Sequence, residues 1–408
     1  MAVTVVVVSY RPGKWLEPCL RSVVDQADRV VLVDNGSEGS RASDIGREVG
    51  AVVVRSPVNL GFAPGVNAGA LLAKGDLLAL LNDDARAMPG WLSSAERVLA
   101  DPTVAAVAPK LVFAARYREV AFPDKGWHAP GDPRPLGRQV RSVQVAGAEV
   151  LAASTGPGLH RLERGEEGDR WRWTAGHRPW YVPLPEGDVG AKVMVDGEEA
   201  PPGPVVRLVN GAGAWLDKRG YAGDIGSGAP DDGRLDRPAD RFALSGAALV
   251  TRLSTWNSLG PFAARYFAYY EDIDWCWRAQ LSGMRLVYDP RATVEHRGST
   301  SSGGEHQPRV RVMSERNRTL TMVRNGPPRL VAKALRDRWR NGPDEGVRAG
   351  IAVQLPWAIA TRTAMSRHWA VGPEDIWRTW AGRDLQWPEG PAGEAAFVSP
   401  ATPGTREL

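Results

Sequence analysis

Two adjacent carboxylates follow a short aliphatic stretch early in the sequence. Leu77–Asn82 leads directly into Asp83 and Asp84. A buried strand with this ending places negative charge at the edge of a sheet where ligands bind. Mg²⁺ and Mn²⁺ bind through one or two carboxylates together with phosphate oxygens, an arrangement that neutralises a leaving diphosphate. A cap on a helix beginning at Pro89 explains the same acid pair equally well.

A second acidic cluster lies among aromatic residues near position 270. Glu271, Asp272 and Asp274 fall within four residues at the start of a predicted helix. The helix dipole favours one acid in the first turn. It does not explain why Glu271 and Asp272 sit together among aromatic side chains. Burial and like charge raise the pKa of a carboxylate and suit it to accept a proton from an alcohol. We therefore interpret the pair as a general base and its neighbour.

Two other segments carry weaker signals. His296 follows a short strand expected at Arg285–Tyr288, and its imidazole could complete a metal shell, although a hydrogen-bonded structural histidine is the commoner explanation. Asn59–Phe62, with Asn67, forms a glycine-bearing loop that opens a helix. It could approach a ligand closely or serve only as a tight turn. It matches neither a dinucleotide fingerprint nor a phosphate-binding loop.

The elements expected around these residues alternate between strand and helix. Short aliphatic runs are typical of strands buried on both faces, and apolar residues at helical spacing lie between them. This alternation predicts an α/β fold with a mostly parallel sheet flanked by helices. The expected strands are Val3–Ser9, Arg29–Asp34, Val52–Ser56 and Leu77–Asn82, and the expected helices are Trp15–Gln26, Ser40–Val49 and Pro64–Lys74.

Beyond a strand at Val104–Phe113 the composition changes. Residues 130–222 are rich in Gly, Pro, Arg and Trp, and their short runs predict an inserted small antiparallel β module. Its strands are expected at Gln139–Val145, Arg170–Thr174, Trp180–Pro183 and Lys192–Val195. Its tryptophans Trp171, Trp173 and Trp180 could stack on a sugar, but a small core is favoured.

The aliphatic signal returns at Phe242–Val250, and the chain ends in a basic helical region. Eight Arg or Lys residues between Arg316 and Arg340 face a single acid, Asp337, and the tail from about Glu389 is expected to be loose. The predicted division is therefore 1–129 and 223–325 as two halves of one domain, 130–222 as the insert, and 326–408 as the basic helical region with its tail.

Composition narrows the class of protein. The 408 residues are 43% hydrophobic and 24% charged, as in a soluble globular protein, and a net charge of +4 does not indicate nucleic-acid binding. Cys19 and Cys276 are too few for a disulfide framework. We find neither a secretory leader nor an apolar run of about 20 residues, so we expect a cytoplasmic protein.

Taken in order, seven segments resemble the family 2 glycosyltransferases, in particular bacterial rhamnosyltransferase-like and galactofuranosyltransferase-like members. The match covers roughly residues 3–325 without the insert. The segments are Val6–Arg11, Val31–Ser37, Asn59–Phe62 with Asn67, Leu81–Asp84, Leu244–Ala248, Glu271–Arg278 and Glu295–Arg297. One such motif could occur by chance, but seven in the family's order are specific.

The resemblance implies a GT-A fold and an inverting, metal-dependent transfer of a sugar from a nucleotide diphosphate. It makes Asp272 the base, Glu271 an aid in orienting the acceptor, and Asp84 and His296 the ligands of Mn²⁺ or Mg²⁺. Asp34 would contact the nucleotide base or ribose, and Asp83 would lie close to the diphosphate or sugar. Many relatives carry Asp where this chain has Asn82, which weakens the charge that holds the metal. The remaining residues of the expected donor site are Ser9, Tyr10, Arg11, Asn59, Gly61, Phe62 and Asn67.

The resemblance also favours particular partners. A dTDP-rhamnose donor is preferred, with a UDP-linked hexose or galactofuranose next, and the acceptor would be a glycan or lipid-linked glycan of the cell envelope. The basic stretch after Arg316 is usually a solvated helix face, but it could hold the enzyme at the inner face of the cell membrane.

Three other readings of the sequence stay open. A sugar nucleotidyltransferase would need a glycine-rich activating loop, which Tyr10–Lys14 fits only in part. A glycoside hydrolase would leave Asp34 and the Asn82–Asp84 segment without a role. A non-catalytic carbohydrate-binding relative would not need Asp84, Asp272 and His296 together.

Overall fold

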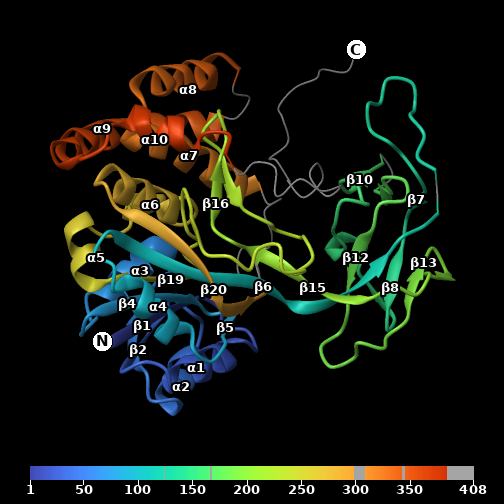
Figure 1. The fold of residues 1–408 in the computed structure, drawn as a ribbon, viewed down its shortest axis with the longest axis horizontal. Coiled ribbons are helices and arrows are strands. Elements are labelled where there is room, and N and C mark those ends of the chain that lie inside the picture. Colours follow the sequence, from blue (N-terminus) through green and yellow to red (C-terminus); the bar gives the residue numbers. More distant parts are fainter. Residues whose placement is uncertain (124, 166–167, 298–307, 342–344, 384–408) are drawn as a thin grey trace.

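The chain folds into a helix-flanked sheet, with a β-rich module on one side and helices at its C-terminal end (Figure 1). The structure is a computed structural model, and it describes residues 1–123, 125–165, 168–297, 308–341 and 345–383. This arrangement confirms the predicted α/β class with an antiparallel β module and a helical C-terminal region. The division at particular residues stays a prediction.

One large sheet forms the centre of the molecule. Its main path has the order β18-β20-β6-β19-β4-β1-β2-β3. Six of these eight described strands run in one direction, because only β18 and β19 oppose their neighbours. The strands are β1 Val3–Ser9, β2 Arg29–Asn35, β3 Val52–Ser56, β4 Leu77–Asn82, β6 Val104–Val120, β18 Ala239–Asp240, β19 Ala248–Arg252 and β20 Arg285–His296. The short strand β5 Ala85–Ala87 pairs with the end of β20.

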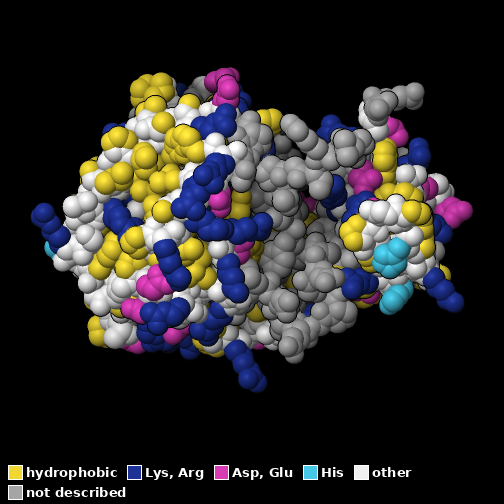
Figure 2. All heavy atoms as spheres, turned by 90° about the horizontal axis from the view of Figure 1, so that it is seen from above, with side chains coloured by type: hydrophobic (Ala, Val, Ile, Leu, Met, Phe, Trp, Pro, Cys, Tyr) yellow, Lys and Arg dark blue, Asp and Glu magenta, His cyan; other side chains and the backbone are white. Residues whose placement is uncertain are grey.

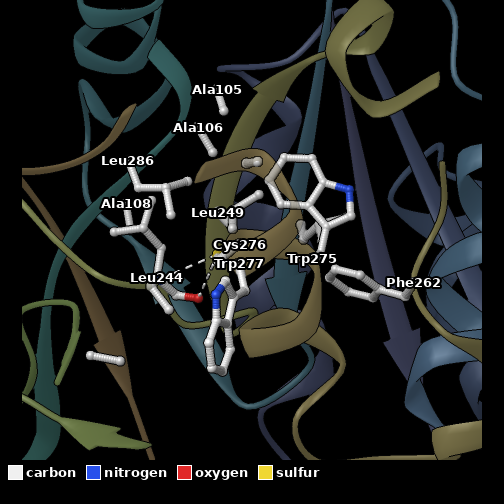
Figure 3. Close-up of a cluster of buried hydrophobic side chains, with 14 of the residues drawn as sticks. Ala105, Ala106, Ala108, Leu244, Leu249, Phe262, Trp275, Cys276, Trp277 and Leu286 are labelled. Carbon is white, nitrogen blue, oxygen red and sulfur yellow. Dashed lines mark hydrogen bonds between the residues drawn. The ribbon is translucent and has the colours of Figure 1, made fainter. Parts of the chain in front are cut away.

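Helices cover both faces of the sheet because alternate side chains of its buried strands point to opposite sides. Val5 and Val7 belong to the core under α1, α2 and α4. Val6 and Val8 belong to the core under α3, α5 and α6. The second core includes Trp275, which lies beside Phe262 in Figure 3. These helices are α1 Leu16–Val24, α2 Arg41–Glu48, α3 Phe62–Ala70, α4 Trp91–Leu99, α5 Leu253–Leu259 and α6 Glu271–Leu281.

The β module has a hydrophobic core of its own but shares a strand with the main sheet. β6 runs on into the module, where β12 Trp180–Pro183 and β15 Val205–Gly211 pair with it. Trp180 is fully buried in the module core, as the core interpretation predicts, whereas Trp171 and Trp173 are half-buried. The other small strands are β7 Gln139–Val140, β8 Val143–Val145, β9 Ala148–Glu149, β10 Glu163–Arg164, β11 Arg170–Trp173, β13 Val193–Val195, β14 Glu198–Glu199, β16 Ala214–Leu216 and β17 Ala222–Asp224.

Four helices follow the sheet, and the basic stretch divides between them. α7 Pro308–Asn325 packs against α6 and α9, and its Arg318 and Arg324 are buried. These two arginines are therefore not part of a solvated face. α8 Pro328–Asn341 keeps Lys333 and Arg336 exposed. α9 Glu345–Met365 and α10 Pro373–Trp380 complete the region. Among the described residues, no helix is both long and apolar enough to cross a bilayer. The tail expected to be loose lies outside the described residues.

Several boundaries differ from the sequence-based expectations. β19 begins at Ala248, six residues after the expected Phe242, because the intervening segment turns into the site described below. β20 extends to His296 instead of ending at Tyr288, so that histidine lies within a strand. The run Gln139–Val145 divides into β7 and β8, and α3 begins two residues earlier than expected.

Candidate active site

The carboxyl end of β4 and the end of β20 bring the first group of predicted residues together. β5 pairs antiparallel with β20, and this pairing sets His296 opposite Ala85. Asp84 Oδ1 consequently lies 3.1 Å from His296 Nε2. Asn82 Nδ2 lies 3.2 Å from the same nitrogen and donates to it. The Asp83–Asp84 pair does not cap α4, because Gly90 occupies the N-cap position and no side chain caps that helix.

The charge distribution of this corner suits a cation. Asp83 accepts a 2.6 Å hydrogen bond from Ser9 Oγ. The pKa of Asp83 is raised from 3.8 to about 6, chiefly by burial and in smaller part by the charge of Asp84, while the Ser9 hydrogen bond opposes the rise. Two carboxylates in partly desolvated surroundings repel each other, so a positive ion between the protein and a diphosphate would lower their energy.

Asp84 and His296 are the protein groups at this corner that could bind Mn²⁺ or Mg²⁺. Within the described parts of the chain, no group of three or more His, Cys, Asp or Glu side chains could hold a metal ion. Asp84 and His296 are nevertheless adjacent, each only about one-tenth exposed. Hard cations that bind phosphates take one or two protein groups and complete their shell with phosphate oxygens and water. The pair fits such a metal, and the imidazole favours Mn²⁺ over Mg²⁺.

His296 has a partner that the sequence-based prediction missed. Its Nδ1 lies 2.8 Å from Oδ1 of Asn210, on β15. The only sequence signal is a polar residue within an otherwise aliphatic run that ends in Asn210-Gly211. Nothing in the local sequence relates this run to His296, which lies 86 positions later.

Asp34 occupies a different environment from the one expected. Its side chain has no exposed surface. Its oxygens accept hydrogen bonds from Ser43 Oγ at 2.6 Å and from the Ser37 N–H at 3.2 Å, and Arg55 Nε lies 3.6 Å away. In this conformation its carboxylate is enclosed by these groups, and the expected contact with a nucleotide stays a prediction. We assign it to holding the loop after β2.

Side-chain amides hold the glycine loop near the same edge. Asn35 Oδ1 accepts from the Leu60 N–H, and Asn59 Oδ1 accepts from the Gly61 N–H. Gly61 has φ +93°, and a Cβ there would lie 2.5 Å from the Phe267 carbonyl oxygen, so only glycine permits this approach. Asn67 is committed elsewhere, since its amide both donates to and accepts from the main chain of Phe262. It therefore ties α3 to the segment after α5.

Tyr10 and Arg11 follow β1 at the rim of this loop cluster. Tyr10 is half-buried and Arg11 is exposed, with φ +55°. The Arg11 guanidinium carbon lies 5.2 Å from the centre of the Tyr10 ring, and the Arg11 N–H donates to Ser37 Oγ. Both side chains have surface open to solvent, whereas Ser9 is fully buried and donates to Asp83.

The predicted base is held by main-chain donors. Asp272 Oδ2 accepts from the Gly246 N–H at 2.9 Å, and Oδ1 accepts from the Ile273 N–H at 2.8 Å. Burial raises the pKa of Asp272, and the two N–H donors only partly offset it. A Cβ on Gly246 would lie 3.4 Å from Asp272 Cβ and 3.5 Å from Phe62 Cε1. The base and the glycine loop therefore flank the same small residue.

The three acids at the start of α6 have different surroundings. Glu271 is 5% exposed, and its Oε2 has no hydrogen-bond partner among the residues that the structure describes. Burial, and then the charge of Asp272, raise its pKa well above the usual range. Asp274 instead lies in a buried ion-pair network with Arg278 and Arg324, which makes it the structural member of the motif. Local sequence could not separate these roles, because Arg324 lies on another helix.

The segment before α6 is held in an unusual backbone conformation. Phe267, Tyr269 and Tyr270 all have φ near +70°, which costs energy for residues with a side chain. Asn317 Nδ2, from α7, donates to the carbonyls of Tyr266, Ala268 and Tyr269 at 2.8–3.0 Å. These hydrogen bonds fix the turn that precedes α6, and so they fix the backbone from which Glu271 and Asp272 project.

A main-chain contact joins the metal corner to the base. The Asn82 N–H donates to the Ala247 carbonyl at 2.9 Å, and Ala247 follows the Gly246 that binds Asp272. The end of β4 and the start of α6 thus lie on either side of one dipeptide. Asp272 and the Asn82–Asp84 segment are linked through Gly246 and Ala247, and His296 lies against Asp84. Gly298 and Ser299, which follow Arg297 in the sequence, lie outside the described residues.

Comparison with known proteins identifies this architecture. Residues 4–141 match the family model described as glycosyl transferase family 2. The N-terminal third of the chain is therefore similar to family 2 glycosyltransferases. The matched residues include β1 to β4 and the Asn82–Asp84 segment, while Asp272 and His296 lie beyond them.

Two curated relatives of the chain come from Mycobacterium tuberculosis. A pre-mycofactocin glycosyltransferase is 37% identical over 255 residues, which is 59% of this chain and 50% of that protein. An N-acetylglucosaminyl-diphospho-decaprenol L-rhamnosyltransferase is 42% identical over 60 residues, or 15% of this chain and 20% of that protein. The chain thus spans half the length of the first relative and a fifth of the second.

A solved structure resembles most of the chain. It is GalNAc-T7 with UDP, GalNAc and Mn²⁺, with a TM-score of 0.52 and 13% identity. The similarity covers 92% of this chain and 56% of that one. At this identity the comparison establishes the fold alone, and it confirms the predicted GT-A architecture.

Proposed function

We propose that this protein transfers a sugar from a nucleotide diphosphate to an acceptor hydroxyl, with Asp272 as the base. The observation that carries the proposal is a pair of main-chain hydrogen bonds: the Gly246 N–H donates to Asp272, and the Ala247 carbonyl accepts from the Asn82 N–H. These contacts, which link the acidic end of β4 and the buried Asp272 to one dipeptide, support the proposal. A transferase of this kind needs one group for a leaving diphosphate and another for an incoming alcohol.

Each step of the proposed reaction uses groups with suitable properties. The acceptor hydroxyl loses its proton to Asp272, whose carboxylate is oriented by the N–H groups of Gly246 and Ile273. The oxygen then attacks the anomeric carbon and the diphosphate leaves, which inverts the configuration. The unpartnered Oε2 of Glu271 is available to orient the acceptor. A divalent metal held by Asp84 and His296 would neutralise the diphosphate.

The finer specificity is also a proposal. A rhamnose donor linked to dTDP is favoured by the resemblance and by the partial match to a rhamnosyltransferase. A UDP-linked sugar is the next candidate. The proposed acceptor is a glycan or lipid-linked glycan for cell-envelope polysaccharide, used on the cytoplasmic side of the membrane.

Surface composition supports peripheral membrane contact as part of this proposal. Trp339 is 48% exposed on α8, and Val353 and Ile359 on α9 are 76% and 51% exposed. Figure 2, which views the molecule from the side of α8 in Figure 1, shows hydrophobic side chains bordered by Lys and Arg. Such a surface suits anionic lipid. Cosedimentation with anionic liposomes at low salt tests it, and absence of binding would remove this part of the proposal.

A thermal-shift panel tests the main proposal. Nucleotide sugars and free diphosphates are compared with and without Mn²⁺ or Mg²⁺. A ligand at about a hundred times its dissociation constant stabilises by roughly 2.7 kcal/mol, which is readily detected. A metal-dependent shift with one pyrimidine diphosphate-sugar supports the proposal and names the donor. Absence of any shift would contradict it. Asp84→Ala should abolish the metal dependence, and a variant that retained it would exclude Asp84 as a ligand.

A further inference from the structure

Asn210 reaches His296 from a strand that leaves the β module. β15 pairs with β6, and the register shifts between Val209 and Gly211: these two residues oppose Val112 and Leu111, which are adjacent in sequence. Asn210 is therefore the extra residue of a β-bulge. Bulges re-aim a side chain that would otherwise follow the alternation of the strand. On the other edge of β6, His296 pairs opposite Phe113, one residue beyond Val112. The bulge thus aims Asn210 at the imidazole.

The hydrogen bonds around the imidazole select one tautomer. An amide oxygen only accepts, so the 2.8 Å contact from His296 Nδ1 to Asn210 Oδ1 requires a proton on Nδ1. The second nitrogen, Nε2, receives the Asn82 Nδ2–H at 3.2 Å, which requires a lone pair there. The Asn210 contact therefore places a proton on Nδ1, and the Asn82 contact is satisfied when Nε2 carries none.

This tautomer leaves two electron-rich atoms facing each other. Nε2 with its lone pair lies 3.1 Å from Asp84 Oδ1. The opposite tautomer would place Nε2–H against the carboxylate and close the pair with a hydrogen bond. A histidine that binds metal through one nitrogen usually donates the other N–H to an oxygen, and that contact fixes its orientation.

We propose that Asn210 is a positioning residue that holds His296 with its proton on Nδ1, so that Nε2 faces Asp84 ready to bind a divalent cation. This inference rests on the metal site of the proposed function. It adds a role for β15, the strand that leads from the β module back to the main sheet and carries Asn210. Loss of an outer partner of this kind costs about 10- to 100-fold in metal affinity.

Three variants separate the hydrogen bond from the space that the side chain fills. Asn210→Leu keeps a similar shape without an acceptor, and Asn210→Ala removes the acceptor without adding bulk. Asn210→Asp keeps an oxygen toward Nδ1. Asn257→Leu, at an exposed position of α5, controls for the chemical change. Folding of each full-length variant is checked by its thermal unfolding.

The first readout is Mn²⁺ affinity in the presence of UDP, from the electron paramagnetic resonance signal of free Mn²⁺. We expect Asn210→Leu and Asn210→Ala to weaken binding about 10- to 100-fold. Asn210→Asp and Asn257→Leu should stay within about threefold of the unchanged protein. Equal affinity in all the variants would overturn the inference while leaving the proposed function intact. No Mn²⁺ binding by the unchanged protein would refute the metal site, and this inference with it.

The second readout does not depend on metal or activity. Nitrogen-15 NMR of histidine-labelled, metal-free protein distinguishes the two tautomers, and His296→Gln assigns the signal. We expect the Nδ1–H tautomer in the unchanged protein and in Asn210→Asp, and a shift toward Nε2–H in Asn210→Leu. A purely structural role for Asn210 would leave the tautomer unchanged. An Nε2–H tautomer in the unchanged protein would overturn the inference.

Discussion

Replacing Asp274 by Asn should destabilise the protein strongly. Asp274 has no exposed surface. Its carboxylate accepts from Arg324 Nε at 2.7 Å, from Arg278 Nε at 3.1 Å and from Asn325 Nδ2 at 2.9 Å. Both guanidiniums are themselves about 95% buried. An amide of the same shape removes the negative charge and presents an NH₂ group to these donors.

The size of the effect follows from what remains buried. Breaking a buried ion pair by removing one partner costs about 3–5 kcal/mol, because the other charge loses its compensation. Here the guanidiniums of Arg278 and Arg324 both lose their compensating negative charge. Because the carboxylate joins α6 to α7, the loss should also loosen the turn that carries Glu271 and Asp272. We expect the free energy of unfolding to fall by at least about 3 kcal/mol at pH 7.

The pH dependence has a definite sign. Burial alone would raise the pKa of Asp274, but Arg324 and Arg278 overcome it and hold the pKa below its usual value of 3.8. A carboxylate with a lowered folded pKa stabilises the protein above its unfolded pKa, and that contribution is lost as the pH falls through the folded value. The difference between Asp274→Asn and the unchanged protein should therefore shrink below about pH 4.

Urea unfolding followed by circular dichroism measures the effect. The control is Asp44→Asn, which breaks an exposed ion pair with Arg47 on α2 and should change stability by less than about 0.5 kcal/mol. A loss below about 1 kcal/mol in Asp274→Asn would refute the view that this network holds α6 against α7.

Three further changes separate chemistry from support. Asp272→Asn should lower turnover about 10²-fold or more with nearly unchanged donor affinity. If donor affinity, measured by titration, fell as much as turnover, Asp272 would have a structural role instead. Asp83→Asn should stabilise the metal-free protein by about 3 kcal/mol at pH 8 and by much less at pH 4, because the raised pKa of about 6 makes folding less favourable as the pH rises from 4 to 6. Urea unfolding at the two pH values measures this gain in stability, and an equal gain at both would contradict the prediction. Asn317→Ala should lower stability by about 1–3 kcal/mol and reduce turnover more than nucleotide binding, and unchanged kinetics would limit Asn317 to a structural role.

The sequence by itself determined the framework of the protein. Runs of aliphatic residues are long enough to form strands buried on both faces, and they are separated by helices of matching length, so the α/β class and the positions of β1 to β4 follow from local pattern. The acidic endings at Asp83 and Asp84 could also be read directly, because the carboxyl ends of parallel strands meet at one edge. The acid-rich start of α6 was equally visible.

Only the tertiary structure decided the surroundings of these residues. Asp272 and Asp274 lie two positions apart, yet Asp272 is held by main-chain N–H groups and Asp274 by arginines, one of them from α7. Asp34 has the expected strand-end position but is enclosed by Ser37, Ser43 and Arg55. Asn210 meets His296 across β6. The surroundings of each of these side chains come from residues that local sequence does not pair with it, and those surroundings determine burial and charge.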